Sequence, residues 1–148
     1  MLPEQIHLVI VGRHTEYTDK IERFIKENKL EERVHIISNV PFDDLPTFYQ
    51  LAEIFVYPSR FEGFGIPIIE ALYSGIPVVA ATGSCLEGPD SIYIHPDDIK
   101  GMANAFKQIY SDPERKKVMI EKGQIFAKRF SEEKQAEEIL NIYKKLMR

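Results

Sequence analysis

The stretch PSRFEGFGIPIIEALYSGIPVV, from Pro58 to Val79, decides the fold that we expect for this chain of 148 residues. Its middle part, Pro67–Gly75, begins with a proline and ends with a glycine, which is the usual punctuation of a helix. Short β-branched apolar runs precede and follow that part, and such runs are typical of buried strands. The stretch therefore predicts a strand–helix–strand unit in which Glu62 and Glu70 lie on either side of the helix start.

The same alternation of strands and helices extends along the chain as far as Pro96. Strands are predicted at Ile6–Gly12, Arg33–Ser38, Ile54–Ser59, Ile76–Ala81 and Ser91–Pro96. Helices are predicted at Thr18–Leu30, Phe42–Glu53, Pro67–Gly75 and, at the end of the chain, at about 97–111, 113–128 and 131–147. Alternating strands and helices form right-handed βαβ units, so we predict the α/β class, with a doubly wound, open parallel sheet and C-terminal helices. We expect the first strand to be buried on both faces and Thr18 to cap the first helix.

Length and composition narrow the class of protein. The formal net charge of -4 and the pI of about 5.6 argue against a nucleic-acid-binding protein, which would normally show a basic face. Cys85 is the single cysteine, which excludes an internal disulfide and suits the cytosol. No apolar run approaches the roughly 20 residues that a membrane-spanning helix needs. We therefore expect a cytoplasmic location.

The Glu62–Glu70 pair has two readings. In one, Glu70 is an ordinary helix-surface residue, and Gly63 and Gly65 merely form a tight turn. In the other, Glu70 lies about one turn into the helix, close to its free N–H groups, which attract anions. A carboxylate accepts two hydrogen bonds side by side, which suits the vicinal diol of a ribose. A diol site beside an anion site predicts a nucleotide as the ligand.

The stretch EGFGIPIIEALYSGIPVVAA resembles the E-x7-E motif and following strand of the family 4, or group 1, retaining glycosyltransferases with the GT-B fold. LVIVG, VHIISNVPFDDLPTFYQLAEIFVYPS and a tyrosine near the end of the last helix are similar to the same half of those enzymes. The resemblance covers almost the whole chain. It implies the donor-binding half of a hexosyltransferase that uses a nucleotide sugar and retains the anomeric configuration. Such enzymes act in polysaccharide or glycoconjugate biosynthesis.

The resemblance also implies roles for residues of the motif. Glu70 is expected to hold the ribose hydroxyls, and Glu62 is expected to be the catalytic residue near the transferred sugar. Backbone amides of Phe64, Gly65 and Ile66 are expected to contact that sugar and the phosphates. Preorganised N–H donors of this kind stabilise a diphosphate leaving group electrostatically.

Three further donor-binding residues follow from the resemblance, because Asn39 and Val40 are expected to flank the base and Gly12 to lie at the same rim. The substrate is expected to be a UDP- or GDP-linked sugar, with no cofactor and no metal. The acidic pairs Asp43–Asp44 and Asp97–Asp98 come at helix starts, where they complement the helix dipole, so we assign them to capping.

Members of this family contain parts that lie upstream of the motifs found here. A strand and helix before LVIVG carry an Arg and a Lys that neutralise the diphosphate, and an N-terminal domain holds the acceptor. We therefore expect residues 1–148 to be one nucleotide-sugar-binding Rossmann-like domain, the C-terminal part of a two-domain enzyme, and to be inactive alone. The segment Cys85–Pro96 is shorter than the family's loop, and a true deletion and an absent mobile segment both stay open.

Alternatives remain in function and at the end of the chain. The first is a stand-alone, non-catalytic nucleotide-binding or signalling α/β module, and the second is another GT-B enzyme, such as a glycogen synthase-like or sugar-phosphate synthase-like protein. In the tail, an apolar stripe predicts a packed terminal helix, with membrane association through its basic residues as the alternative. The stripe consists of Ile139, Ile142, Tyr143 and Leu146, and the basic residues are Lys144, Lys145 and Arg148.

Overall fold

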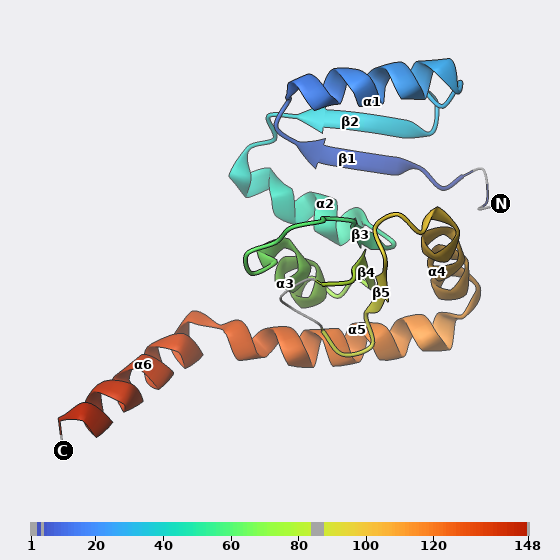
Figure 1. Cartoon of the computed structure of the whole chain (residues 1–148). Coiled ribbons are helices and arrows are strands. Elements are labelled where there is room, and N and C mark those ends of the chain that lie inside the picture. Colours follow the sequence, from blue (N-terminus) through green and yellow to red (C-terminus); the bar gives the residue numbers. More distant parts are fainter. Residues whose placement is uncertain (1–2, 4, 84–87, 148) are drawn as a thin grey trace. The chain divides into compact units, whose positions relative to one another are not determined.

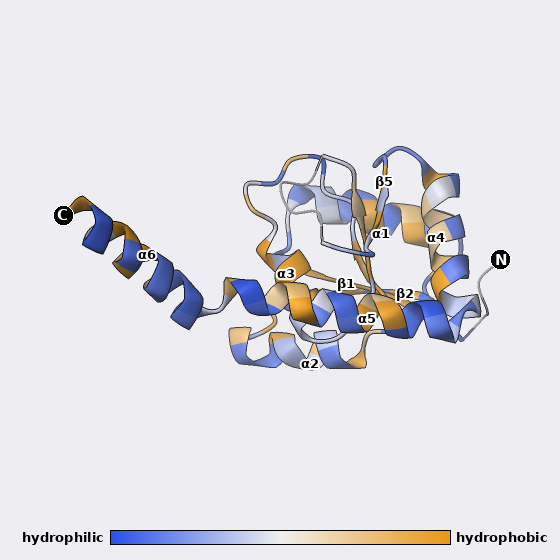
Figure 2. Ribbon diagram, turned by 90° about the horizontal axis from the view of Figure 1, so that it is seen from below, coloured by the Kyte–Doolittle hydropathy of each residue, from blue (hydrophilic) through white to orange (hydrophobic). Residues whose placement is uncertain are grey.

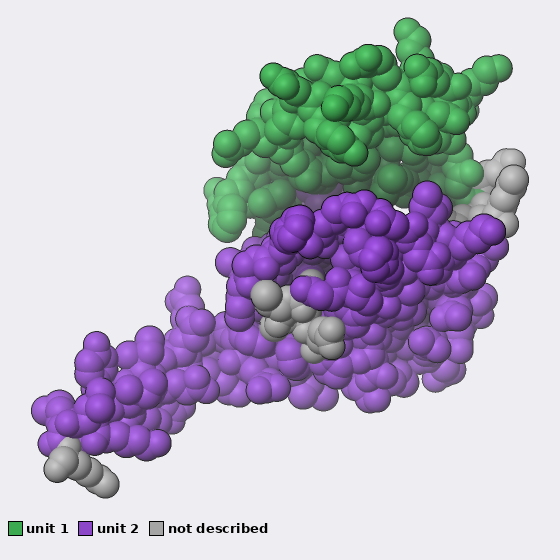
Figure 3. Space-filling model, viewed as in Figure 1, with its two compact units in different colours: residues 1–46 green, residues 47–148 purple. Residues whose placement is uncertain are grey.

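The structure is a computed structural model that describes residues 3, 5–83 and 88–147. The chain divides into two compact units, residues 1–46 and residues 47–148, which have different colours in Figure 3. Cys85 lies outside the described residues, and so does part of the short Cys85–Pro96 segment. The expectation of one domain over residues 1–148 stays a prediction.

The predicted strands and helices are all present, in the predicted order, with ends that differ by a few residues (Figure 1). The first unit contains β1 (Leu8–Gly12), α1 (Glu16–Glu27), β2 (Val34–Ser38) and the 3₁₀ turn η1 (Phe42–Asp44). Helix α2 (Leu45–Leu51) begins at the end of the first unit and continues into the second. The second unit then contains β3 (Phe55–Tyr57), α3 (Ile66–Tyr73), β4 (Val78–Ala81), β5 (Ile92–Ile94), α4 (Ile99–Ser111), α5 (Pro113–Ala127), the 3₁₀ turn η2 (Lys128–Phe130) and α6 (Glu132–Leu146).

In the first unit, β1 and β2 pair in parallel, with Leu8 opposite Val34 and Gly12 opposite Ser38. The expectation that this first strand is buried on both faces is wrong. Leu8 is 48% exposed and Val9 is 45% exposed, although their side chains point to opposite faces. The reason is that β2 is the one strand paired with β1 among the described residues, so β1 is an edge strand.

Helix caps differ in part from the prediction. Thr15, not Thr18, is the N-cap of α1, and the backbone N–H of Thr15 donates to Thr18 Oγ1 at 2.9 Å. Thr18 is thus the third helical residue, in the reciprocal arrangement of a capping box. Asp98 caps α4 as predicted, because its Oδ1 accepts from the Gly101 N–H at 2.8 Å. Asp43 and Asp44 lie inside η1, whose N-cap is Pro41 without a side-chain capping bond.

The second unit has a parallel sheet in the order β3–β4–β5, with helices against both faces of β4. Val78 and Ala80 are fully buried in a cluster that includes Ile68 of α3. Val79 points to the opposite face and packs in a second cluster with Ile109 of α4. Helix α5 contributes other residues to both clusters, and all four residues of the central strand β4 are buried. This covering is what a doubly wound sheet requires.

Strand pairing among the described residues gives a two-stranded and a three-stranded sheet, where the sequence predicted a single open sheet. The segment that holds η1 and α2 separates β2 from β3 along the chain. The predicted α/β class with parallel strands is confirmed.

Helix α6 is not packed as the sequence predicted. Its apolar residues are between 51% and 78% exposed: Ile139, Leu140, Ile142, Tyr143 and Leu146. The helix follows directly after η2 and projects beyond the end of α5 (Figure 1). Figure 2 shows orange patches along α6 beside its blue, hydrophilic surface. The apolar stripe is therefore present, but the described part of the chain places no core against it.

No helix in the described ranges combines the length and the apolar character that crossing a membrane would require.

Candidate functional site

The loops that follow β3 and β5 lie at one edge of the second unit's sheet, because parallel strands end on the same side. The loop after β3 carries Glu62, and the loop after β5 carries Asp97. An ion pair between Arg60 and Asp97 ties the two loops together, and Arg60 Nη1 also lies 3.3 Å from Asp97 Oδ2. An exposed ion pair therefore joins the two loops at the edge where the sequence predicted the ligand.

Helix α3 starts at this edge with an unusual backbone turn. Gly65 is its N-cap and has φ of 85° and ψ of 39°, the left-handed conformation that residues with a Cβ rarely adopt. The Gly65 carbonyl accepts the Ile68 N–H at 2.9 Å, and Pro67 lies in the first turn. The N-terminal end of α3 carries the positive end of the helix dipole. The helix start predicted from the sequence is confirmed.

The other end of α3 closes as the sequence predicted. Gly75 has φ of 77°, and its N–H donates to the Leu72 carbonyl at 3.2 Å. The Ile76 N–H donates to the Ala71 carbonyl at 3.1 Å. This pair of bonds is a Schellman motif, which satisfies the last carbonyls of the helix and sends the chain into β4.

Glu70 lies one turn into α3 and is partly buried. The Tyr49 hydroxyl, from α2, donates a hydrogen bond of 2.8 Å to Glu70 Oε2. Among the described residues, no hydrogen bond to Glu70 Oε1 is found. Glu70 thus has one oxygen held by the protein and a second that can accept from a ligand.

Glu62 has a similar partner on the neighbouring strand. The Tyr57 hydroxyl, at the end of β3, donates a hydrogen bond of 2.6 Å to Glu62 Oε1. The bond spans the turn between the strand end and the loop, since the two residues are five positions apart. Each glutamate of the pair therefore accepts a hydrogen bond from one tyrosine.

The two tyrosine hydroxyls keep their protons at neutral pH. Burial raises the pKa of Tyr57 from 10.0 to about 12, and the hydrogen bond to Glu62 and its negative charge act in the same direction. Burial likewise raises the pKa of Tyr49, with the hydrogen bond to Glu70 as the second cause. A phenolate beside a carboxylate would be repelled, so the protonated donor is the favoured form.

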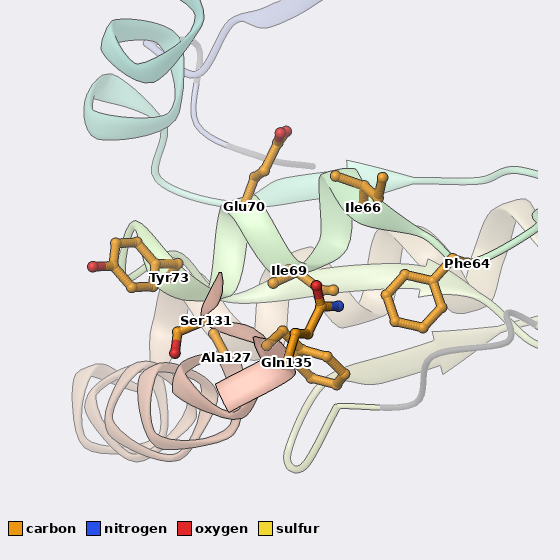
Figure 4. Close-up of a pocket in the computed structure, with 9 residues that line it drawn as sticks. Phe64, Ile66, Ile69, Glu70, Tyr73, Ala127, Ser131 and Gln135 are labelled. Carbon is orange, nitrogen blue, oxygen red and sulfur yellow. The ribbon is translucent and has the colours of Figure 1, made fainter. Parts of the chain in front are cut away.

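A cavity of about 410 Å³ lies beside α3. Its lining includes Phe64, Ile66 and Glu70 of the predicted site, together with Ile69, Tyr73, Ala127, Phe130, Ser131 and Gln135. Figure 4 shows the Glu70 carboxylate pointing away from Ser131 and Gln135. The Phe64 ring packs edge-on against Phe130, with centroids 5.8 Å apart. The Phe64 side chain thus contacts the protein, and the role predicted for its backbone amide remains a prediction.

The remaining predicted residues belong to the first unit. Gly12 ends β1 opposite Ser38, and Asn39 follows directly after Ser38, so Gly12 and Asn39 lie at the same edge of the two-stranded sheet. Asn39 adopts a left-handed backbone with φ of 60°, and Val40 follows it. Asn tolerates this conformation better than most residues, because its short side chain can bond locally.

Sequence reasoning missed Tyr49, Tyr57 and Arg60 as residues of this region. Tyr57 ends an apolar strand and Tyr49 lies in a short helix, so both patterns indicate core positions. In the described part of the chain, no group of three or more His, Cys, Asp or Glu side chains is placed to hold a metal ion.

Comparisons with known proteins bear on the family. A model of the glycosyl transferases group 1 family matches residues 2–126. O-antigen chain mannosyltransferase B of Escherichia coli is 31% identical over 142 residues, which are 94% of this chain and 37% of that protein. Sucrose-phosphate synthase of Thermosynechococcus elongatus aligns with a TM-score of 0.84 and 26% identity, over 95% of this chain and 38% of its own.

HepE of Anabaena, solved in complex with UDP-glucose, aligns with a TM-score of 0.85 and 23% identity, over 97% of this chain and 42% of that chain. These structural neighbours have the GT-B glycosyltransferase fold, so the expected fold is confirmed. The chain spans little more than a third of the mannosyltransferase, 37% of its length. The Glu62–Glu70 stretch lies within the residues that the family model matches, and the chain belongs to the glycosyl transferases group 1 family.

Proposed function

We propose that this chain binds the nucleotide-sugar donor of a retaining hexosyltransferase that acts in polysaccharide or glycoconjugate biosynthesis. One observation carries the proposal: Glu62 and Glu70 lie on either side of the left-handed Gly65 that starts α3, after the carboxyl end of β3. Nucleotide binding is also supported by the likeness to HepE, which was solved with UDP-glucose. The similarity to an O-antigen chain mannosyltransferase supports a sugar polymer as the product.

The proposed chemistry follows from what these groups can do. Glu70 accepts hydrogen bonds from the two ribose hydroxyls through its carboxylate, which offers two oxygens. The first-turn N–H groups of α3 face the diphosphate and stabilise the charge that it gains as the bond to the sugar carbon breaks. The acceptor hydroxyl forms the new bond to the same carbon, and its proton passes to the departing diphosphate. Glu62 contacts the sugar, and we assign it no covalent intermediate.

A donor linked to UDP or GDP is the form that we propose, with no separate cofactor or metal. Gly12, Asn39 and Val40 are assigned to the base side of the nucleotide. The acceptor is assigned to parts of a longer protein, because this chain spans 37% of its mannosyltransferase relative.

A second candidate is a sucrose-phosphate synthase-like enzyme, which the alignment with sucrose-phosphate synthase favours. Both candidates use a nucleotide sugar and differ in the acceptor. Titration calorimetry with UDP-, GDP- and ADP-linked sugars identifies the base, and transfer to a sugar phosphate identifies the second candidate.

The decisive variant for the proposal is Glu70→Ala. It should weaken nucleotide binding by about 1–3 kcal/mol, or about 5- to 150-fold, because charge-assisted hydrogen bonds are lost. Glu121→Ala is the matched control, since Glu121 is an exposed glutamate within α5. Calorimetry gives the affinities, and circular dichroism checks the fold. Unchanged affinity in Glu70→Ala would refute the ribose role.

A further inference from the structure

We propose that Tyr49 and Tyr57 are positioning residues, each of which orients one glutamate of the Glu62–Glu70 pair toward a different part of the donor. The inference rests on the proposed function, because it assumes that the pair contacts a nucleotide sugar. It adds two residues that the E-x7-E pattern does not contain. It also assigns a separate measurable effect to each of them.

The geometry pairs each tyrosine with its own carboxylate. Tyr49 reaches across from α2 to Glu70 on α3, at 2.8 Å from Oε2. Tyr57, on β3, donates to Glu62 at 2.6 Å from Oε1. A phenol has a single O–H to donate, so each hydroxyl binds one carboxylate oxygen. Because a carboxylate is planar, this bond also sets the direction of the second oxygen.

The tyrosine rings are themselves held by packing. Phe55 lies between them in an aromatic row, with ring centroids 5.5 Å from Tyr49 and 5.7 Å from Tyr57. All three rings are partly buried against the cluster that includes Ile68 and Val78. Packing therefore holds the two tyrosine rings in place, and their hydroxyls restrict the positions of the two glutamate side chains at the edge of the sheet.

Holding a glutamate in advance matters because a flexible side chain must otherwise be ordered when the ligand binds. The effect differs between the two positions. For Glu70, Oε1 has no hydrogen-bond partner among the described residues, which fits an oxygen that accepts from a ribose hydroxyl. For Glu62, the proposed contact is the transferred sugar. Tyr49 should thus act on ribose recognition, and Tyr57 on sugar recognition.

The test compares Tyr49→Phe and Tyr57→Phe in the 148-residue chain by calorimetry, since both changes remove the hydroxyl and keep the ring. The probes are UDP, 2′-deoxy-UDP and UDP-glucose, with the GDP and GDP-mannose counterparts in parallel. Tyr17→Phe is the matched control, because Tyr17 is 66% exposed on α1. Circular dichroism and thermal unfolding verify that each variant is folded.

Tyr49→Phe should lower the preference for UDP over 2′-deoxy-UDP by about three- to tenfold, the size of an ordinary net hydrogen bond, because Glu70 loses the bond that orients it. It should leave the gain in affinity from UDP to UDP-glucose unchanged. Tyr57→Phe should show the reverse. Its gain in affinity from UDP to UDP-glucose should be smaller, and its preference for UDP over 2′-deoxy-UDP should equal that of the wild type. A merely structural role would weaken all ligands alike and would leave both ratios as in the wild type.

The results of these titrations distinguish a failure of the positioning roles from a failure of the proposed function. Nucleotide binding that is lost in Glu70→Ala, with both ratios unchanged in the two tyrosine variants, overturns the positioning roles and leaves the proposed function standing. A wild-type chain that binds neither UDP nor GDP overturns the proposed function, and the positioning roles with it. The two crossed ratio changes, absent in Tyr17→Phe, support the inference.

Discussion

At the scale of single residues, the hydroxyl of Tyr57 makes the folded state sensitive to alkaline pH. Burial and the bond to Glu62 raise the pKa of Tyr57 to about 12, whereas an unfolded chain should have the ordinary value near 10. Above pH 10 the unfolded state loses this proton first, so it binds fewer protons than the folded state. The free energy of unfolding must then fall as the pH rises, up to the folded pKa.

We therefore predict that the titration of Tyr57 lowers the free energy of unfolding between about pH 10 and pH 12 and leaves it unchanged at lower pH. Tyr57→Phe removes the contribution, so the stability difference between wild type and variant should shrink across the window. Urea unfolding of both proteins at pH 8, 9, 10, 11 and 11.5 measures this difference. The titration of lysines affects both proteins equally, so it cancels when their unfolding free energies are subtracted. A difference that stays constant from pH 9 to pH 11.5 would contradict the prediction.

Gly63 and Gly65, near the start of α3, differ in how well they should tolerate a larger residue. A Cβ added at Gly63 would meet no atom within 4 Å, whereas Gly65 has a left-handed backbone with φ of 85°. Alanine at Gly65 would therefore cost about 1–2 kcal/mol of strain. At Gly63 the folded chain has room for a methyl group.

At the scale of elements, an added methyl group at Gly63, in the turn from β3 into α3, should matter only when a ligand is present. We predict that Gly63→Ala leaves the unfolding free energy within about 0.5 kcal/mol of wild type, as is usual for surface substitutions. It should lower nucleotide-sugar affinity by about tenfold, or about 1.4 kcal/mol, if the donor lies against this backbone. Urea unfolding and calorimetry measure the two quantities, with Gly65→Ala as the strained comparison. Unchanged affinity would mean that the donor does not approach Gly63.

We also predict that nucleotide binding at the start of α3 weakens as salt is added. The N-terminal end of α3 and Arg60 are the positive groups described at this edge, and Arg60 is exposed and paired with Asp97. Salt screens partly exposed charges over about 10 Å at 0.1 M. Nucleotide affinity that depends on these groups should decrease as salt is added, and the calorimetric titration at two salt concentrations reports it.

At the scale of the whole molecule, we predict that this chain binds a nucleotide sugar and does not transfer the sugar. Its 148 residues span 37% of the mannosyltransferase relative, and we assign the acceptor site to the remaining length of such proteins. The assay incubates the chain with radiolabelled UDP- and GDP-sugars and candidate glycan acceptors. A full-length glycosyltransferase of known donor serves as the positive control. Acceptor-dependent turnover by the chain alone would show that its site is complete.

Much of the architecture could be predicted from the sequence, because it depends on local patterns. Pro67 and Gly75 mark the two ends of α3, and both ends are where the sequence placed them. The apolar run at β4 is typical of a buried strand, and Val78 and Val79 are fully buried in different clusters. In contrast, the run at β1 has the same pattern, and Leu8 is 48% exposed. Burial depends on the neighbours that a strand acquires, which its own residues do not specify.

The sequence by itself determined the order of elements, the helix start at the glutamate pair and, through its motif, the family. These features depend on backbone preferences and spacings within a short segment. Only the tertiary structure decided which groups hold the glutamates. Tyr49 and Glu70 are 21 positions apart and come from two different helices. Their hydrogen bond exists because one core cluster, which includes Phe55 of β3 and Ile68 of α3, brings α2, β3 and α3 together. No local propensity encodes such a contact.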